Sequence, residues 1–268
     1  MYKTITSSQN PIIKNIQLLD SKSRERRKQG LFVVEGKREI SMAFKGGYQF
    51  QTILFCPKIF PETTFSKFVK KVYPKPECIA LSSDLYKKIA YRSSTEGIIG
   101  IAKTKSLHLD DIQFSKKNPL ILVAEAPEKP GNIGALLRTA DAAKLDAVII
   151  ANPKTDMYNP NIIRSSLGCV FTNAIASGTT DEIISFLKRN NISIYCAALQ
   201  GSVSYHLADY TQSTAIVVGT EATGLSENWL AESTKNILIP MQGEIDSMNV
   251  SVAAGILIFE AKRQRNFL

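Results

Sequence analysis

Residues 236–265 read NILIPMQGEIDSMNVSVAAGILIFEAKRQR, and their character changes twice along this stretch. Ile237 to Ile239 form an apolar run that stops at Pro240, which predicts a buried strand, because proline cannot donate to a strand ladder. A polar loop follows from Met241 to Asn249. Val250 to Phe259 is then apolar almost all round, a pattern typical of a helix that packs on more than one side.

The loop between this strand and this helix has two interpretations. It carries two carboxylates, Glu244 and Asp246, together with Ser247 and Asn249. A polar loop held at both ends by buried elements keeps its donors and acceptors in set positions with water partly excluded, which favours a ligand site. A plain connection in which Asn249 or Ser251 caps the helix is equally consistent with this stretch alone.

The chain has 268 residues, 44% hydrophobic and 21% charged, an ordinary globular composition for one large or two smaller domains. No apolar run approaches the ~18 to 20 residues of a membrane span, and the N-terminus lacks the apolar centre of a signal peptide. We therefore expect a cytoplasmic protein without a membrane partner. Cys56, Cys78, Cys169 and Cys196 are widely spaced, which predicts reduced, mostly structural cysteines and no metal site.

The positive charge is concentrated in the first part of the chain. The net charge is +9, and residues 1–105 hold 20 Lys and Arg against 8 Asp and Glu, whereas residues 106–268 hold 13 against 16. A basic domain beside a near-neutral one favours a division in which one part holds a nucleic acid and the other acts on it. A basic domain without a partner is the alternative.

Residues 1–105 predict a compact α/β module, followed by a linker at 106–118 and a second domain at 119–268. The predicted elements alternate in order: helix 8–20, strand 31–34, helix 37–47, strand 50–55, helix 61–74, strand 77–82, helix 83–92 and strand 96–103.

A basic run separates the first predicted helix from the first predicted strand. Arg24, Arg26, Arg27 and Lys28 lie in this run, which Gly30 ends. Such a run is often only a solvated helix face. Here it leads straight into a buried strand, which would fix the charges on one rim of a folded unit, and we predict that these four residues bind RNA.

Residues 119–268 predict a mostly parallel sheet. PLILVAEA from Pro119 and the segment after it give a strand, a turn, a helix and a second buried strand, the βαβ arrangement of parallel sheets. Later strands end in loops of small and polar residues at 199–201, 219–224 and 241–249. Ligands of open α/β sheets sit beyond the carboxyl ends of strands, so we expect these three loops to form one pocket.

The ligand of this pocket is not an ordinary nucleotide. The Rossmann pattern G-x-G-x-x-G and the P-loop pattern are both absent. The turn PGNIG places Gly131, Asn132 and Gly134 before a helix, with Arg138 about one turn into it. Taken alone, Arg138 is better read as a helix surface residue than as a functional one.

Three separated motifs carry a family resemblance. EAPEKPGNIGALLRTADA at 125–142, VVGTEATGLS at 217–226 and ILIPMQGEIDSMNVSVAAGILIFEAKRQR at 237–265 closely resemble the SpoU (TrmH-like) RNA ribose 2'-O-methyltransferases of the SPOUT class. The resemblance covers about 150 C-terminal residues and is specific, since the three motifs agree in order and spacing. NPIIK at 10–14 and FVVEG at 32–36 are similar to the RNA-binding substrate domain that often precedes these enzymes, a less specific match.

The resemblance implies a deep trefoil knot in the C-terminal α/β domain and a homodimer whose interface lies beside the site. It implies S-adenosylmethionine as the cofactor and a ribose 2'-hydroxyl of rRNA or tRNA as the acceptor. The positions that match the family's cofactor-binding residues are Leu199, Gly219, Ile239, Met241 and Met248. One departure is visible: the family usually reads Ser-Leu-Asn where this chain has Ser247, Met248 and Asn249, a swap of two apolar residues of similar size.

The resemblance also implies roles for polar residues. Arg138 matches the arginine to which the family assigns activation of the hydroxyl. A guanidinium stays protonated in proteins, so Arg138 is equally open to a role as a clamp on the adjacent phosphate. Asn132, Glu221, Ser247 and Asn249 match other family positions, expected to hold Arg138 and the loops in register. For Glu221 a bracing role is as well supported as a catalytic one.

Two functions of different class follow from the sequence. The first is an RNA 2'-O-methyltransferase, whose target distinguishes RNA from DNA. The second is an inactive RNA-binding or ribosome-assembly protein with the same fold. The presence of Asn132, Arg138, Glu221 and Asn249 favours the enzyme.

Overall fold

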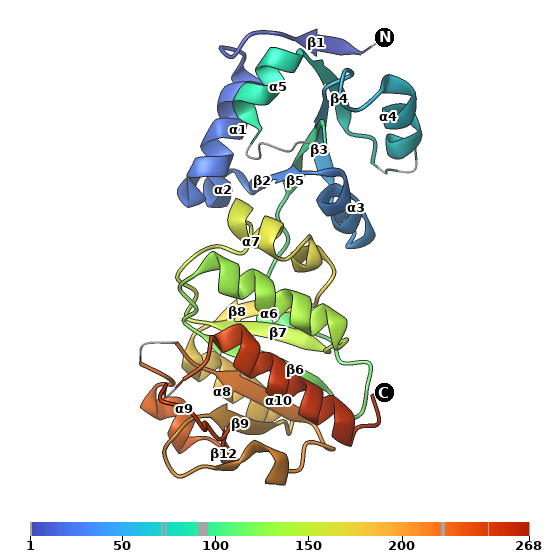
Figure 1. The fold of residues 1–268 in the computed structure, drawn as a ribbon. Helices are drawn as coiled ribbons and strands as arrows, with labels where there is room; N and C mark the ends of the chain where they lie inside the picture. Colours follow the sequence, from blue (N-terminus) through green and yellow to red (C-terminus); the bar gives the residue numbers. More distant parts are fainter. Residues whose placement is uncertain are drawn as a thin grey trace. The chain divides into compact units, whose positions relative to one another are not determined.

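The computed structural model describes residues 2–70, 72, 74–90, 96–220, 223–245 and 247–267. The chain forms two compact units (Figure 1). The first unit is Met1–Lys105 with Asp156–Thr172, and the second is Ser106–Thr155 with Asn173–Leu268. The predicted boundaries 1–105, 106–118 and 119–268 did not anticipate that 156–172 belongs with the first unit.

A mixed sheet forms the centre of the first unit. In the described part of this unit the sheet has five strands in the order β1-β4-β3-β5-β2. β5 is antiparallel to β2 and β3, whereas β4 is parallel to β1 and β3. The strands are β1 (Lys3–Ile5), β2 (Leu31–Glu35), β3 (Phe50–Phe55), β4 (Glu77–Leu81) and β5 (Ile98–Lys103). The sequence did not predict β1, which is only three residues long.

The first unit has helices in the four predicted regions, and also helices that the sequence did not predict for this unit. The predicted regions form α1 (Pro11–Ser21), α3 (Lys37–Lys45), α4 (Glu62–Val69) and α5 (Ser83–Ile89), and α2 (Ser23–Gln29) and α7 (Pro160–Ser165) lie outside them. Pro11 occupies the first turn of α1, and the Asn10 side chain accepts a hydrogen bond from the Ile12 amide at 2.9 Å. Ile13, Ile16 and Leu19 place the buried stripe of α1 against the sheet. Gly30 ends α2 in the left-handed conformation, at φ 62°.

The segment 156–172 packs against β2. The Tyr158 ring stacks on Phe32 with 4.4 Å between centroids, and the Phe171 ring stacks on the same side chain at 5.7 Å. Residues 161–171, NIIRSSLGCVF, do not form one continuous helix. Instead α7 ends at Ser165, and a 3-10 turn (Cys169–Phe171) follows. Leu167 and Gly168 both have positive φ and turn the chain between them.

The second unit is built on a parallel sheet. Over the residues that the structure describes, this sheet has seven strands in the order β10-β12-β9-β11-β6-β7-β8, and each neighbouring pair of these strands is parallel. The strands are β6 (Leu120–Glu125), β7 (Ala147–Ala151), β8 (Ile175–Gly178), β9 (Ser193–Ala197), β10 (Val203–Ser204), β11 (Thr214–Val218) and β12 (Lys235–Leu238). β6, β7 and β11 are buried along their whole length, as expected of strands covered on both faces.

Helices cover both faces of this sheet (Figure 1). They are α6 (Pro130–Ala142), α8 (Thr180–Arg189), α9 (Glu227–Ala231) and α10 (Val250–Gln264). α6 and α10 pack against each other, and α8 packs against α9 and the strands on the other face. A capping box of Thr179 and Glu182 begins α8. Within the described residues, no helix combines the length and the apolar character needed to cross a bilayer.

The stretch 236–265 forms the predicted strand, loop and helix. β12 ends at Leu238, so Ile239 lies just beyond the strand, and α10 continues to Gln264 instead of ending at Phe259. The helix cap is Asn249, whose side-chain oxygen accepts a hydrogen bond from the Ser251 amide at 3.0 Å. The capping alternative and the polar-loop alternative are therefore compatible.

Candidate functional site

The predicted loops begin side by side at one edge of the parallel sheet. β12, β9, β11 and β6 are successive neighbours. Since all of them run in the same direction, their carboxyl ends meet at one edge. The loops 198–202, 219–226 and 239–249 leave from that edge, together with the turn that enters α6. This is the position at which open α/β sheets bind ligands.

Two hydrogen bonds tie the first loop to the strand beside it. The Ala198 amide donates to the Ile237 carbonyl at 3.1 Å, and the Asn236 side chain donates to the Gln200 carbonyl at 3.0 Å. Leu199, a predicted cofactor contact, lies between these anchors and is 67% exposed. The backbone is thus fixed on both sides of an exposed apolar side chain.

The second loop closes tightly on itself. Thr220 and Gly224 exchange two backbone hydrogen bonds of 3.1 Å each. A Cβ at Gly219 would lie 2.3 Å from the carbonyl carbon of Gly224, so only glycine fits at this predicted cofactor position. The Thr223 amide donates to Oγ1 of Thr220 at 3.0 Å. Glu221, a predicted catalytic residue, lies outside the described residues.

A buried carboxylate that the sequence analysis missed anchors the end of this loop. Glu125, the last residue of β6, is 6% exposed. Its Oε1 accepts from the hydroxyls of Thr180 at 2.9 Å and Ser226 at 2.8 Å, and its Oε2 accepts from the Ser226 amide at 2.8 Å. Three donors compensate the burial of the charge. In the sequence, the feature that points to Glu125 is its position as a charged residue directly after an apolar run.

The residues of PGNIG are helical and do not form the expected turn. Pro130 occupies the first position of α6, where its missing amide costs no hydrogen bond, so Gly131, Asn132 and Gly134 lie in the helix. Arg138 is therefore about two turns into α6, not one. Its side chain is exposed. Helix geometry places Arg138 roughly 120° around α6 from Asn132, and the expectation that Asn132 holds Arg138 stays a prediction.

Asn132 contacts the last loop. The Asn249 side-chain amide donates to Oδ1 of Asn132 at 3.2 Å. Oδ1 of Asn249 accepts from the amide and the hydroxyl of Ser251, at 3.0 and 2.6 Å. Asn249 therefore joins the start of α10 to the first turn of α6, and two of the predicted catalytic positions are brought together.

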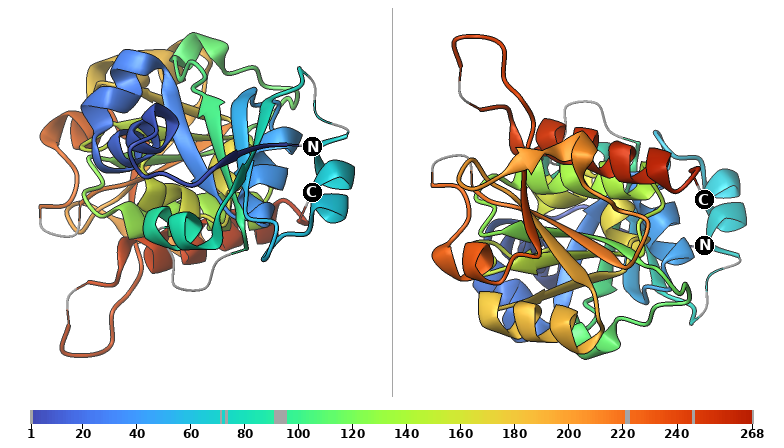
Figure 2. Two further views of the ribbon diagram at one scale, coloured as in Figure 1. Left: turned by 90° about the horizontal axis from the view of Figure 1, so that it is seen from above. Right: turned by 90° about the horizontal axis from the view of Figure 1, so that it is seen from below.

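The remaining predicted residues belong to the loop between β12 and α10. Ile239, Met241 and Met248 are partly buried, whereas Ser247 is exposed. The middle of the loop projects away from the sheet (Figure 2). Its two ends, and not its middle, therefore lie at the common edge.

These loops present backbone groups and apolar side chains to the edge. Leu199, Ile239 and Met248 supply apolar surface, and an added Cβ at Gly201, Gly224 or Gly243 would have open space around it. Such a lining suits a flat aromatic ligand whose polar edge is read by the backbone, as an adenosine would be. In the part of the chain that the structure describes, no group of three or more His, Cys, Asp or Glu side chains forms a metal site.

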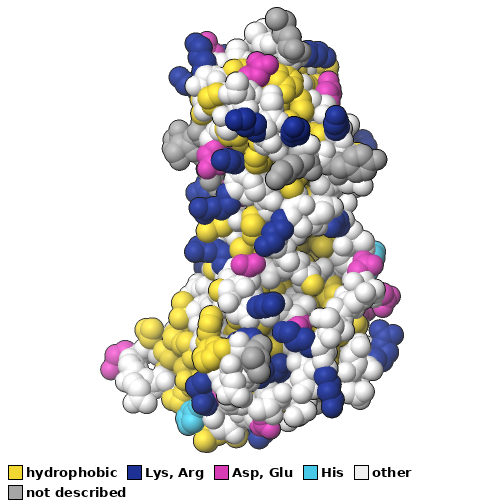
Figure 3. All heavy atoms as spheres, turned by 90° about the vertical axis from the view of Figure 1, so that its right-hand side faces the viewer, with side chains coloured by type: hydrophobic (Ala, Val, Ile, Leu, Met, Phe, Trp, Pro, Cys, Tyr) yellow, Lys and Arg dark blue, Asp and Glu magenta, His cyan; other side chains and the backbone are white. Residues whose placement is uncertain are grey.

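The basic run of the first unit divides into exposed and buried members. Arg24, Arg27 and Lys28 are exposed on α2, and Figure 3 shows further Lys and Arg side chains on the visible face of this unit. Arg26 does not share their position, because it is only 3% exposed. Its Nε and one terminal nitrogen donate to the two carboxylate oxygens of Asp156 at 3.0 and 2.7 Å. The prediction that Arg26 contacts RNA is corrected, because its guanidinium is committed within the fold.

Two models of known protein families match separate parts of the chain. The SpoU rRNA Methylase family model matches residues 119–259, and the MRM3-like substrate binding domain model matches residues 10–100. The chain is 28% identical over 260 residues to the 23S rRNA (guanosine(2553)-2'-O)-methyltransferase RlmP of Bacillus subtilis (strain 168), covering 97% of this chain and 99% of that protein.

Solved structures resemble the whole chain. The crystal structure of an RNA 2'-O ribose methyltransferase has a TM-score of 0.82 and 34% identity, over 98% of this chain and 99% of that one. An AdoMet-bound rRNA methyltransferase from Sinorhizobium meliloti has a TM-score of 0.89 and 27% identity, over 97% of each chain.

Proposed function

This chain belongs to the SpoU rRNA methylase family, and we propose that its natural substrate is a ribose of ribosomal RNA. It is an S-adenosylmethionine-dependent RNA 2'-O-methyltransferase, which transfers a methyl group to the 2'-hydroxyl of ribose. The observation that carries the proposal is the meeting of the loops after β9, β11 and β12 at one sheet edge, beside the helix that holds Arg138. The alternative of an inactive protein with the same fold is not favoured.

S-adenosylmethionine supplies a methyl group on a sulfonium centre. We assign its binding to Leu199, Gly219, Ile239, Met241 and Met248. The tight approach of Gly219 to Gly224 supports this assignment, because it leaves backbone rather than side chains on that wall. The hydrogen bonds at Ala198 and Asn236 fix the backbone on both sides of Leu199 and so support its assignment as a positioned cofactor contact.

The reaction requires the chain mainly to position the reacting groups. The 2'-hydroxyl would have to lie in line with the methyl group and to release its proton to solvent water as its oxygen takes up the methyl group. We assign to the exposed Arg138 the phosphate beside the reacting ribose, because a permanently charged guanidinium binds phosphate in a bidentate way and stabilises negative charge on the oxygen. Asn132 and Asn249 hold the last loop on α6. Glu221 and Ser247 complete the proposed catalytic set.

The knot and the homodimer belong to the proposal as well. Val252 and Phe259 of α10 are exposed apolar residues. Hydrophobic side chains also gather on one face of the second unit in Figure 3. An apolar helix face of this kind is typical of an interface between subunits. Light scattering coupled to size-exclusion chromatography is expected to give twice the mass of the monomer. A mass equal to that of the monomer at every protein concentration would contradict the dimer.

We assign RNA capture to Arg24, Arg27 and Lys28 of the first unit, and we expect the protein to work in the cytoplasm. The exposure of these three charges on one short helix supports the assignment.

The proposed substrate has a direct test. Calorimetry with S-adenosylmethionine measures the cofactor site, and labelled cofactor then reports transfer to ribosomal and transfer RNA from cells that lack the protein. We expect saturable cofactor binding and label on ribosomal RNA at a ribose. Label on transfer RNA alone would overturn the choice of substrate, and cofactor binding without any transfer would favour the inactive alternative.

A further inference from the structure

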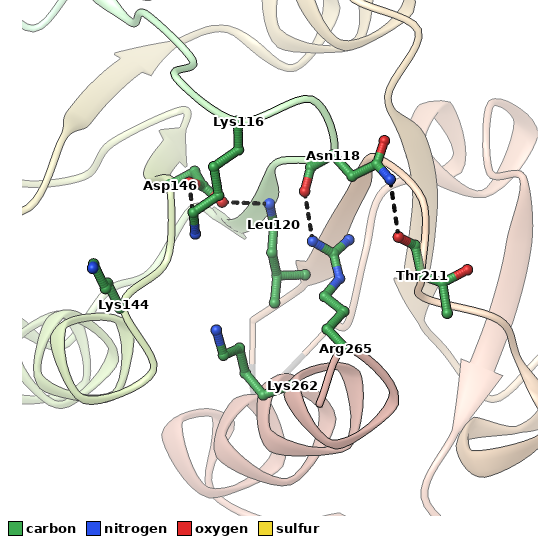
Figure 4. A pocket seen from close by; sticks show the side chains of 8 residues that line it. All are labelled: Lys116, Asn118, Leu120, Lys144, Asp146, Thr211, Lys262 and Arg265. Carbon is green, nitrogen blue, oxygen red and sulfur yellow. Dashed lines mark hydrogen bonds and ion pairs between the residues drawn. The ribbon is translucent and has the colours of Figure 1, made fainter. Parts of the chain in front are cut away.

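A second charged site lies at the opposite edge of the parallel sheet. A cavity of about 200 Å³ is lined by Lys116, Asn118, Leu120, Lys144, Asp146, Thr211, Lys262 and Arg265 (Figure 4). Leu120 is the first residue of β6, and Lys144 and Asp146 lie just before β7. The cavity therefore opens at the amino ends of strands whose carboxyl ends face the loops of methyl transfer.

The two sites are separated by the length of the sheet. β6 spans six residues. At roughly 3.3 Å per residue this places the cavity about 20 Å from the carboxyl edge. A ligand of the cavity is therefore not part of the cofactor site.

Among the described residues that line the cavity, positive charges outnumber negative ones. Four cations and one carboxylate line it. The carboxylate is committed, because Oδ2 of Asp146 accepts from the Leu120 amide at 2.8 Å and Oδ1 lies 3.2 Å from the Lys116 ammonium. Arg265 is also fixed, because its guanidinium donates to the carbonyls of Tyr210 and Asn118, each at 2.7 Å, and to that of Gln212. It acts as a stationary positive charge in the wall.

Lys262 is the least exposed of the cations. Its side chain comes from α10, and the residue is only 6% exposed. Figure 4 shows its ammonium directed into the space between Lys144 and Leu120. Burial lowers the pKa of Lys262, and the nearby charges of Lys116 and Arg265 lower it further. An ammonium in these surroundings gains from any anion that enters the cavity.

We propose that this cavity binds one phosphate group of the substrate RNA backbone, through Lys144 and Lys262. The volume suits a single tetrahedral anion and falls below the roughly 300 Å³ at which pockets admit drug-sized ligands. Among the lining residues none is aromatic, so the cavity offers no surface on which a base could stack. Lysine ammonium groups bind phosphate as point charges without reading sequence.

This inference rests on the proposed function, because RNA is the polyanion that it places in the cavity. An RNA strand that binds at both edges of the sheet would have its reacting ribose held in position at the loops that follow β9, β11 and β12. Free inorganic phosphate shares the same chemistry and is the other source of such an anion.

Two variants remove the charges with little change of shape. Lys144→Gln acts on an exposed side chain, and Lys262→Met replaces a buried ammonium by an apolar group, a change that is often tolerated. Lys117→Gln is the matched control, because Lys117 is an exposed neighbour in the sequence that does not line the cavity. Thermal unfolding of all three checks that they fold.

RNA affinity measured against salt is the main readout. In the double variant Lys144→Gln with Lys262→Met, we expect the slope of log affinity against log salt concentration to decrease in magnitude by about one. In Lys117→Gln we expect the same slope as in the wild type. Equal slopes in the double variant and the wild type would overturn the proposal. So would phosphate-dependent thermal stabilisation that the double variant loses while its RNA slope stays intact, because free phosphate would then be the ligand.

Failure of the proposed function gives a different pattern. A wild-type protein that binds RNA with the expected slope but transfers no methyl group contradicts the activity and leaves the cavity assignment standing. Cofactor affinity, measured by calorimetry, is expected to be the same in wild type and double variant, because the cavity lies at the other edge of the sheet.

Discussion

Asn249 donates a hydrogen bond from its side-chain amide to Oδ1 of Asn132 at 3.2 Å, across 117 positions of the sequence. Asn249 is also the N-cap of α10, and Asn132 lies in the first turn of α6. One side chain therefore begins the last helix and fixes it to the helix that carries Arg138.

A double-mutant cycle tests this link. Asn249→Ser keeps a capping side chain and removes the amide donor, and Asn132→Ala removes the acceptor. Because both changes break the same bond, we expect each to lower kcat/KM about tenfold and the double variant to lose little more, a coupling of roughly 1 kcal/mol. Steady-state kinetics measure the coupling. Losses that multiply in the double variant would mean that the two side chains act independently.

Arg138→Ala is expected to lower the rate of methyl transfer sharply and to leave the affinity for S-adenosylmethionine nearly unchanged. The loss of a positioned cation at a developing negative charge costs on the order of a hundredfold in rate. Arg138→Lys keeps the charge without bidentate geometry and should recover only part of the rate. Arg189→Ala, an exposed arginine on α8, is the control. Full activity in Arg138→Ala would refute the assigned role.

Glu125→Gln is expected to weaken cofactor binding by about tenfold. The substitution puts an amide donor where a carboxylate oxygen accepts hydrogen bonds, so either Ser226 or Thr180 faces a donor. The loop 219–226 would lose its anchor on β6. Calorimetry gives the affinity, and hydrogen exchange reports the loop. Wild-type exchange in that loop would show that Glu125 does not hold it.

The basic run should separate into two kinds of variant. Replacing Arg24, Arg27 and Lys28 by Gln is expected to weaken RNA binding and to retain the stability of the fold. The slope of log affinity against log salt concentration should decrease in magnitude by about two to three. Arg26→Met leaves Asp156 as a partly buried carboxylate without its partner and should lower the free energy of unfolding by about 3 kcal/mol. Lys235→Gln, on β12 in the second unit, is the control. A flattened slope in Arg26→Met alone would contradict the buried assignment.

Asp20 predicts a pH dependence of stability. Burial, and next the charge of Glu35, raise the pKa of its carboxyl from 3.8 to about 7, against an opposing effect of Arg26. The folded chain therefore holds this proton more tightly than the unfolded chain. The stabilisation is complete below about pH 4 and is lost as the pH rises through about 7.

Asp20→Asn cannot titrate and should remove this dependence. We expect the variant to gain stability relative to the wild type between pH 5 and pH 8, by an amount on the order of 2 kcal/mol at the upper end. Denaturant unfolding at four pH values measures the difference. A constant difference between the two proteins across this range would contradict the assignment.

Local pattern was enough to predict most of the elements. β6 is apolar from Leu120 to Ala124 and β11 from Ala215 to Val218, and Asn249 stands at a cap position that its residue type favours. Parallel strands then determine where the loops meet, so the edge of the site followed from the strand order. The family resemblance supplied the cofactor and the acceptor.

Contacts between distant residues could not be predicted in the same way. Arg26 looks like Arg24 and Arg27 in the sequence, and only its partner Asp156, 130 positions away, distinguishes it. Glu125 receives donors from two later helices for the same reason. The turn PGNIG was misassigned because glycine and proline mark turns more often than first turns of helices.

The first unit consists of two stretches of chain, and this limits how the gene can be recombined. A single crossover near codon 105 would give a chimera whose Arg26 faces a foreign residue in place of Asp156 and whose Phe32 loses the rings of Tyr158 and Phe171. A viable transplant of the first unit must carry codons 156–172 with it. The two halves of this enzyme are therefore expected to be inherited together rather than exchanged as separate cassettes.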